Sequence, residues 1–221
     1  MGAAIGEVFG FAIGVAISPV PIIAVILMLF SARAKANGVS FVLGWLIGLL
    51  LAGGVVLAIG LEASEGGPSD ASGWIKILIG VLFLFLAWRQ WSGRPQGEEE
   101  PQMPGWMASI DDFTASKSFG LAFVLAAVNP KNLGLTVAAA AAISAGGLSG
   151  GEEVVVLVVF ALLASLTVAV PVVWFLVSGP SAEEQLTVMK DWLLANNNTV
   201  MAVLFVVLGA KLLGDGISIL A

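Results

Sequence analysis

Two proline motifs, each deep inside a long apolar segment, are the residues most suited to bind a ligand. Ser18-Pro19 and Asn129-Pro130 each lie near the middle of such a segment. Ser and Asn are favoured helix N-caps and Pro is favoured at the first helical position. Each motif therefore predicts a half-helix that begins near mid-membrane, where unpaired N–H groups favour an anion. The alternative is a plain proline kink that neighbouring helices satisfy.

Three further residues add to these motifs. Pro21 prolongs the first interruption because it also lacks an N–H. Lys131 places a positive charge beside the second break, where burial costs about 2.5–3.5 kcal/mol. Removing this charge is expected to leave stability unchanged or higher. Lys211, in the last apolar segment, is a second candidate, which could instead reach the membrane surface or pair with Asp215.

The acidic residues and the missing residue types limit the chemistry. All 15 acids fall in loops or near segment ends, whereas cation- and proton-coupled carriers usually place a carboxylate near the midplane. With Lys131 present, this pattern favours an anionic or zwitterionic cargo. The chain has no Cys and no His, which excludes haem, iron–sulfur clusters, thiolate or imidazole zinc sites and histidine relays. We expect no enzymatic activity, no cofactor, no metal and no nucleic-acid partner.

The elements that position these residues are membrane helices. Of 221 residues, 59% are hydrophobic and 11% are charged, compared with about 25% charged in soluble domains. Six apolar segments are each long enough to cross about 30 Å of hydrocarbon, where backbone hydrogen bonding requires a helix. We therefore predict an all-α, polytopic membrane protein. Its six transmembrane helices would cover residues 5–30, 38–61, 73–91, 118–145, 153–178 and 199–219.

Basic residues near the segment ends predict the orientation, because cytoplasmic loops carry more Lys and Arg. Only Lys76 lies on one side. Both termini are therefore expected outside and the loops 31–37, 92–117 and 179–198 inside. Six basic residues lie on the predicted inner side: Arg33, Lys35, Arg89, Arg94, Lys117 and Lys190.

The two halves of the chain repeat the same pattern. Pro130 follows Pro19 at an offset of 130 − 19 = 111, about half the chain. Three spans in each half invert the second half relative to the first, as in secondary transporters that bind substrate on broken helices at the midplane. The predicted organisation is therefore two inverted three-helix repeats with broken helices one and four. Residues 1–91 form the first repeat, 92–117 a cytoplasmic linker and 118–221 the second.

Small residues and two loop segments complete the pattern. Gly10-x3-Gly14, Gly44-x3-Gly48 and Gly53-Gly54 predict close helix packing. The segments PGWMASIDDF and VMKDWLL, in the predicted inner loops, are either short interfacial helices or ordinary loop packing.

Three segments carry a resemblance to a known family: SPVPIIAVILML, PGWMASIDDFTASKSFGLAFVLAAVNPKNLGL and VLGAKLLGDG. They resemble the GAP family, named for glycopeptidolipid addressing, which includes the sulfolipid-addressing proteins and belongs to the lysine-exporter (LysE) superfamily. The resemblance implies a six-span bacterial inner-membrane protein that assists movement of glycolipids or other polar lipids to the cell envelope. The family motifs fall on Ser18, Pro19, Pro21, Asn129, Pro130, Lys131 and Asn132.

Three functions remain open from the sequence. The first is a secondary carrier or flippase for an anionic or glycosylated lipid. The second is an exporter of a small polar solute such as an amino acid, and the third is a non-transporting adaptor of a larger lipid exporter. Membrane lipids are expected partners in each case, and the sequence leaves a homodimer open.

Overall fold

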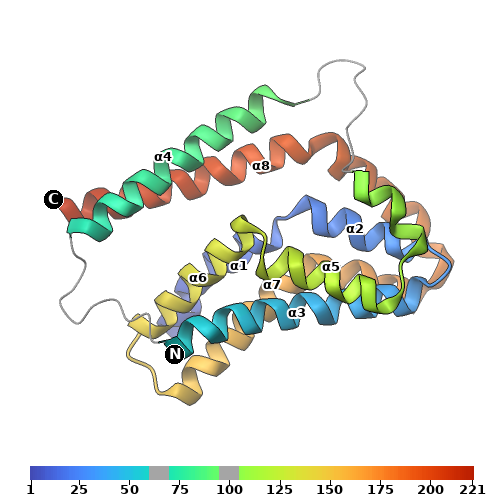
Figure 1. Ribbon diagram of the computed structural model, residues 1–221, viewed down its shortest axis with the longest axis horizontal. Helices are drawn as coiled ribbons and strands as arrows, with labels where there is room; N and C mark the ends of the chain where they lie inside the picture. The colour runs from blue at the N-terminus through green and yellow to red at the C-terminus, as the bar shows by residue number, and fades with distance from the viewer. Residues whose placement is uncertain (60–69, 95–104) are drawn as a thin grey trace. The chain divides into compact units, whose positions relative to one another are not determined.

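The computed structural model describes residues 1–59, 70–94 and 105–221, and within these ranges every regular element is a helix. Figure 1 shows the helices in chain order. Their bounds are α1 Gly2–Ala16, α2 Pro19–Leu29, α3 Ala34–Ile59, α4 Asp70–Ser92, η1 Gly105–Asp112, α5 Ala115–Ala127, α6 Pro130–Ala145, α7 Gly150–Ser178, η2 Gly179–Ala182 and α8 Glu183–Leu220.

The chain forms two compact units, and each draws on both halves of the sequence. Unit 1 comprises Met1–Leu61 and Gln102–Leu194, and unit 2 comprises Glu62–Pro101 and Ala195–Ala221. The helix α8 passes from unit 1 into unit 2.

Two pairs of helices are bent where the sequence predicts breaks. The axes of α1 and α2 differ by 58°, and those of α5 and α6 by 61°. Pro19 and Pro130 are the first residues of α2 and α6, so both predicted half-helix beginnings are confirmed.

Unit 1 buries the first half-helix almost completely. Nine of the eleven residues of α2 are buried, because it packs against α3 on one side and α7 on another. Helix α1 packs against α6 and α7, and α3 against α5, α6 and α7. A helix that is apolar all round, as α2 is, is typical of a buried segment.

Glycine contacts bring α3 close to its neighbours, as predicted. A side chain at Gly44 would collide with the backbone of Phe119, and a Cβ at Gly48 would lie 2.9 Å from the Cβ of Ala126. Gly14 and Gly53 likewise face close neighbours, but nothing lies within 4 Å of a Cβ at Gly10 or Gly54. Close packing is therefore confirmed at four of the six glycines.

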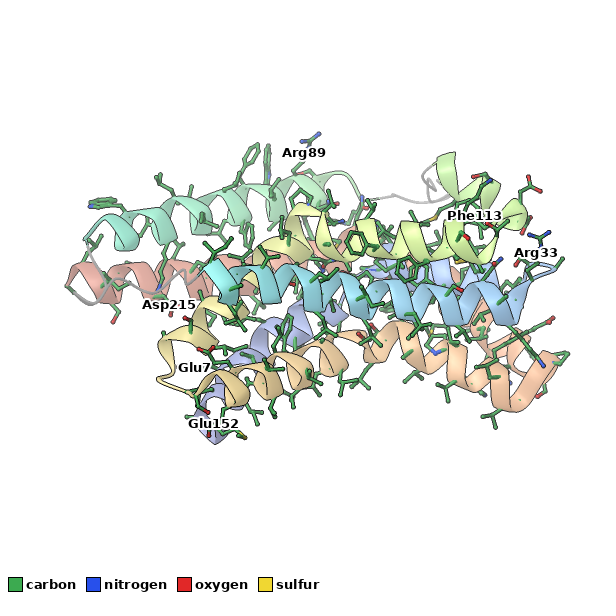
Figure 2. The ribbon with its side chains drawn as sticks, turned by 60° about the horizontal axis from the view of Figure 1, so that its bottom comes forward. Glu7, Arg33, Arg89, Phe113, Glu152 and Asp215 are labelled. Carbon is green, nitrogen blue, oxygen red and sulfur yellow. The ribbon has the colours of Figure 1, made fainter. Side chains whose placement is uncertain are left out.

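Figure 2 labels three charged residues of unit 1, and all three lie at its ends. Arg33 and Phe113 lie at one end, and Glu7 and Glu152 lie at the other. The helices between these ends expose large apolar side chains such as Leu43 and Leu162. This distribution is that of a protein whose long sides face lipid.

Unit 2 is an antiparallel pair of helices. It is formed by α4 and by residues 195–220, which are the second part of α8. A Cβ at Gly80 would lie 3.0 Å from the carbonyl oxygen of Gly209, and one at Gly209 would lie 3.0 Å from that of Gly80. The rings of Phe83 and Phe205 lie 5.4 Å apart between centroids. Glycines thus let the two backbones approach closely along this pair.

Two of the predicted inner loops contain helices. In the loop 179–198, η2 and the first part of α8 make the segment helical, so VMKDWLL takes the helical one of its two predicted forms. Glu183 and Glu184 lie in the first turn of α8, where carboxylates stabilise a helix. In the predicted linker, PGWMASIDDF contains η1, whose Met107 and Ile110 are buried, and the Glu98-Glu99-Glu100 run lies outside the described residues.

By length and composition, the described residues contain two to four candidate membrane spans. The first is α3, and the second is the 71-residue run Gly150–Leu220. Each bent pair adds one more if it is counted as a single span. The chain thus contains apolar helices that suit a membrane.

Candidate functional site

The Lys131 side chain reaches across from one helix break to the other. Its ammonium group donates hydrogen bonds to the carbonyl oxygen of Gly14 at 3.0 Å and to that of Ile17 at 2.7 Å. It also donates to the Ser18 hydroxyl at 2.6 Å. The two carbonyls belong to the C-terminal end of α1, which carries partial negative charge. Lys131 therefore compensates the carbonyl groups that the first break exposes.

A second hydrogen-bond connection runs through Asn132. The Ser18 hydroxyl donates to Oδ1 of Asn132 at 3.1 Å. The Nδ2 of Asn132 donates in turn to the carbonyl oxygen of Leu125 at 2.9 Å, one turn before the second break. Both Ser18 and Asn132 are buried. The four residues Lys131, Ser18, Asn132 and Leu125 form a continuous chain of hydrogen bonds, which we call the break cluster.

The two predicted N-caps differ. Asn129 caps α6 as predicted, since its Oδ1 accepts from the backbone N–H of Lys131 at 3.1 Å. Ser18 occupies the N-cap position of α2 in an extended conformation, but its side chain makes no capping bond. A capping oxygen bonds to the N–H of the second or third helical residue, and here the third is Pro21, which has none. The Ser18 hydroxyl instead donates to Asn132 and accepts from Lys131 within the break cluster.

The beginnings of α2 and α6 offer fewer donors to an anion than two ordinary helices would. Pro19 and Pro21 have no N–H, so the first turn of α2 has a single backbone donor, that of Val20. In α6, Pro130 has none and the N–H of Lys131 is used by Asn129, which leaves the N–H of Asn132. The ammonium of Lys131 is therefore the main positive group at the breaks.

Thr167 on α7 makes a contact beside the first break that the sequence did not predict. Its hydroxyl donates to the carbonyl oxygen of Ala16 at 2.7 Å, beside the first break. The only signal for it is a hydroxyl within an apolar run, and such hydroxyls usually bond within their own helix, as Ser165 does with Ala161. Its role toward α1 could not have been read from the sequence.

Lys211 is not part of the break cluster. It belongs to unit 2, and its ammonium forms an ion pair with Asp215 at 2.7 Å, with both side chains more than one-third exposed. This pairing is one of the two alternatives predicted for it. Among the residues the structure describes, no three acidic side chains lie together as a metal site would require.

Comparison with known proteins gives one match. A family model described as Sap, sulfolipid-1-addressing protein, matches residues 8–218. This match confirms the family to which the three sequence segments pointed. No curated protein and no solved structure matches the chain.

Proposed function

Because the chain belongs to the sulfolipid-1-addressing protein family, we propose that it is a secondary carrier or flippase of the bacterial inner membrane. Its cargo is an anionic or glycosylated polar lipid that moves toward the cell envelope. The observation that carries this proposal is the break cluster. There, a lysine charge, a hydroxyl and an amide converge on two bent helices.

The lengths of the helices support six spans. At 1.5 Å per residue the 71-residue run is about 107 Å long, more than three times the hydrocarbon thickness. We therefore assign one span to α7 and another to the second part of α8. The 23 residues of α4 reach about 35 Å and supply a further span. With α3 and the two bent pairs, six spans result.

The matched breaks support an inverted repeat. The two bends differ by only 3° (61 − 58), and a proline begins the second helix of each pair. Three spans in each half place the halves in opposite orientations. In this arrangement the two breaks lie at similar depth, where half-helix ends bind substrates in secondary transporters.

The contacts of Lys131 suggest how a cargo enters. The ammonium group bonds to two carbonyl oxygens and one hydroxyl. A sulfate, phosphate or carboxylate headgroup carries a full negative charge and forms stronger hydrogen bonds with an ammonium than neutral oxygens do. The headgroup thus replaces one or more of these oxygens, while the Val20 N–H supplies a further donor.

The test is lipid movement in proteoliposomes made with the full-length chain. The probes are a sulfated glycolipid with a fluorescent acyl chain and the neutral glycolipid with the same chain. A membrane-impermeant reductant reports which leaflet holds the label. The wild type should move the sulfated probe faster than the neutral one, and Lys131→Met should move neither above the protein-free rate. Lys117→Met, which removes an exposed lysine on α5, should match the wild type.

Two outcomes would overturn the proposal. If Lys131→Met moves the sulfated probe at the wild-type rate, the charge has no part in cargo binding. If the wild-type protein moves neither lipid, the lipid carrier is excluded. Efflux of a trapped amino acid from the same vesicles would then indicate the small-solute exporter, and its absence would indicate an adaptor.

A further inference from the structure

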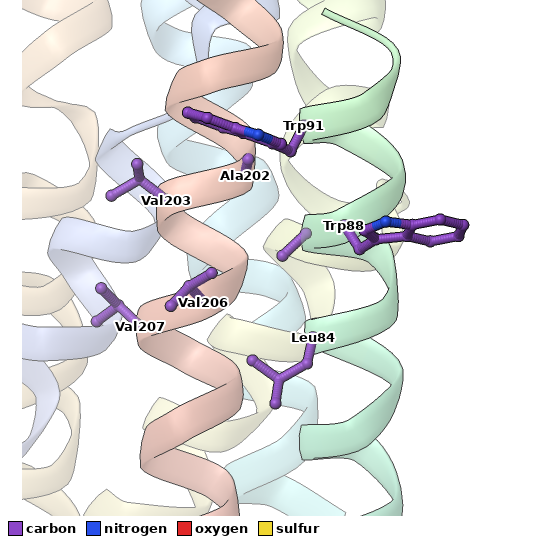
Figure 3. A pocket seen from close by; sticks show the side chains of 8 residues that line it. Leu84, Trp88, Trp91, Ala202, Val203, Val206 and Val207 are labelled. Carbon is purple, nitrogen blue, oxygen red and sulfur yellow. The ribbon is translucent and has the colours of Figure 1, made fainter.

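Unit 2 contains an apolar groove between α4 and the second part of α8. Its volume is about 390 Å³, within the range of roughly 300–1,000 Å³ that is usual for ligand sites. Figure 3 shows the Trp91 ring extending from α4 toward α8 near Ala202. The lining residues are Leu84, Ala87, Trp88, Trp91, Ala202, Val203, Val206 and Val207.

One end of the groove is polar and positively charged. The guanidinium of Arg94 lies 3.9 Å from the centre of the Trp91 ring, and its Nη1 donates to the Trp91 carbonyl oxygen at 3.0 Å. These contacts hold the charge beside the aromatic wall. At the same end, Nδ2 of Asn198 donates to the carbonyl oxygen of Gly93 at 2.5 Å, and Oδ1 of Asn197 is buried without a partner. The groove is thus apolar along its length and polar at one end.

The two chain segments that form the groove carry positive charges and no negative ones. Arg89 and Arg94 are the charged residues of segment 77–94, and segment 195–210 has none. A ligand with an apolar chain and a negative head complements this arrangement. A neighbouring protein helix that bound through apolar contact alone would leave the positive charge of Arg94 without a negative partner.

We propose that this groove binds one acyl chain of an anionic phospholipid, with the phosphate of its headgroup on Arg94. Trp91 lies at the boundary between chain and head, where amphipathic rings prefer to lie. Basic residues between membrane helices are known to recognise anionic headgroups. All the groove residues belong to unit 2 and none belongs to the break cluster, so this proposal does not depend on the lipid-carrier proposal.

The test is native mass spectrometry of the delipidated full-length protein after incubation with equal amounts of dioleoyl phosphatidylglycerol and dioleoyl phosphatidylcholine. The two lipids have the same chains and differ in net charge. The wild type should retain the anionic lipid about fivefold more than the zwitterionic one, the effect expected of one basic side chain at a membrane surface. Arg94→Gln should remove the preference. Arg89→Gln removes an exposed charge from α4, at a position that does not line the groove, and this variant should retain the preference.

A second pair of variants tests the groove itself. Val206→Phe fills it, whereas Val81→Phe places the same ring on an exposed position of α4 outside it. Val206→Phe should retain less of both lipids, and Val81→Phe should match the wild type. Equal retention in these two variants would overturn the proposal. So would an unchanged preference in Arg94→Gln, or a dimer that carries no lipid and dissociates only in Val206→Phe.

Discussion

The Ser18 hydroxyl donates a hydrogen bond to Oδ1 of Asn132 at 3.1 Å, which joins two helix breaks 114 residues apart in the chain. The bond is buried, so it is made in surroundings where an unpaired polar group costs more than at the surface. Each broken helix therefore stabilises the other, and a change at one break is expected to affect the second.

The first prediction concerns the stability of this link. Asn132→Leu leaves the Leu125 carbonyl without its donor, at about 1–3 kcal/mol for an orphaned buried group. It also leaves the Ser18 hydroxyl with only its bond from Lys131. The midpoint of thermal unfolding, followed by tryptophan fluorescence in detergent, should fall. In a cycle with Ser18→Ala, the two losses should be non-additive by about 0.5–3 kcal/mol, as for residues in direct contact. Simple additivity would show that the bond contributes nothing.

The second prediction concerns Lys131, whose contacts lead to a different expectation from the one drawn from the sequence. If only the predicted depth of Lys131 in the membrane is considered, removing its charge should leave the stability of the protein unchanged or higher. In the structure, however, Lys131→Met deprives the Gly14 and Ile17 carbonyls of their donor. We expect the variant to be less stable by about 1–3 kcal/mol, and Lys131→Arg to recover part of the loss. Transport rates should be normalised to folded protein, and a midpoint equal to or above that of the wild type would contradict the prediction.

The third prediction compares two glycines of the same helix. Gly44→Ala forces a methyl group into the Phe119 backbone and should destabilise the protein by about 1–3 kcal/mol, the usual effect of overpacking. Gly54 has open space around its Cβ position, so Gly54→Ala should be neutral or stabilising by up to about 1 kcal/mol, because Ala is the better helix former. Equal midpoints for the two variants would show that close approach of α3 and α5 does not matter.

The fourth prediction concerns orientation. Six basic residues near segment ends lie on one predicted side and one on the other, so both termini should be outside. A reporter inserted at Gly67 should be active outside the cell, and one at Gly97 should be active in the cytoplasm. The reverse pattern would invert the assignment without affecting the break cluster.

The sequence by itself determined the class of the fold and the position of both breaks. Its apolar composition required membrane helices, because lipid offers no partners for backbone groups. A proline cannot continue a hydrogen-bonded helix, so Pro19 and Pro130 marked the first residues of α2 and α6. These effects are local, and residue types alone decide them.

Tertiary structure decided which groups satisfy the breaks. The sequence assigned Ser18 to a cap and Lys131 to an incoming anion, but neither assignment considers a partner more than 100 residues away. Only packing brings the Lys131 ammonium to the end of α1, and Thr167 to Ala16. Contacts between distant segments depend on how whole helices pack, and the spacing of residues along the chain does not contain that information.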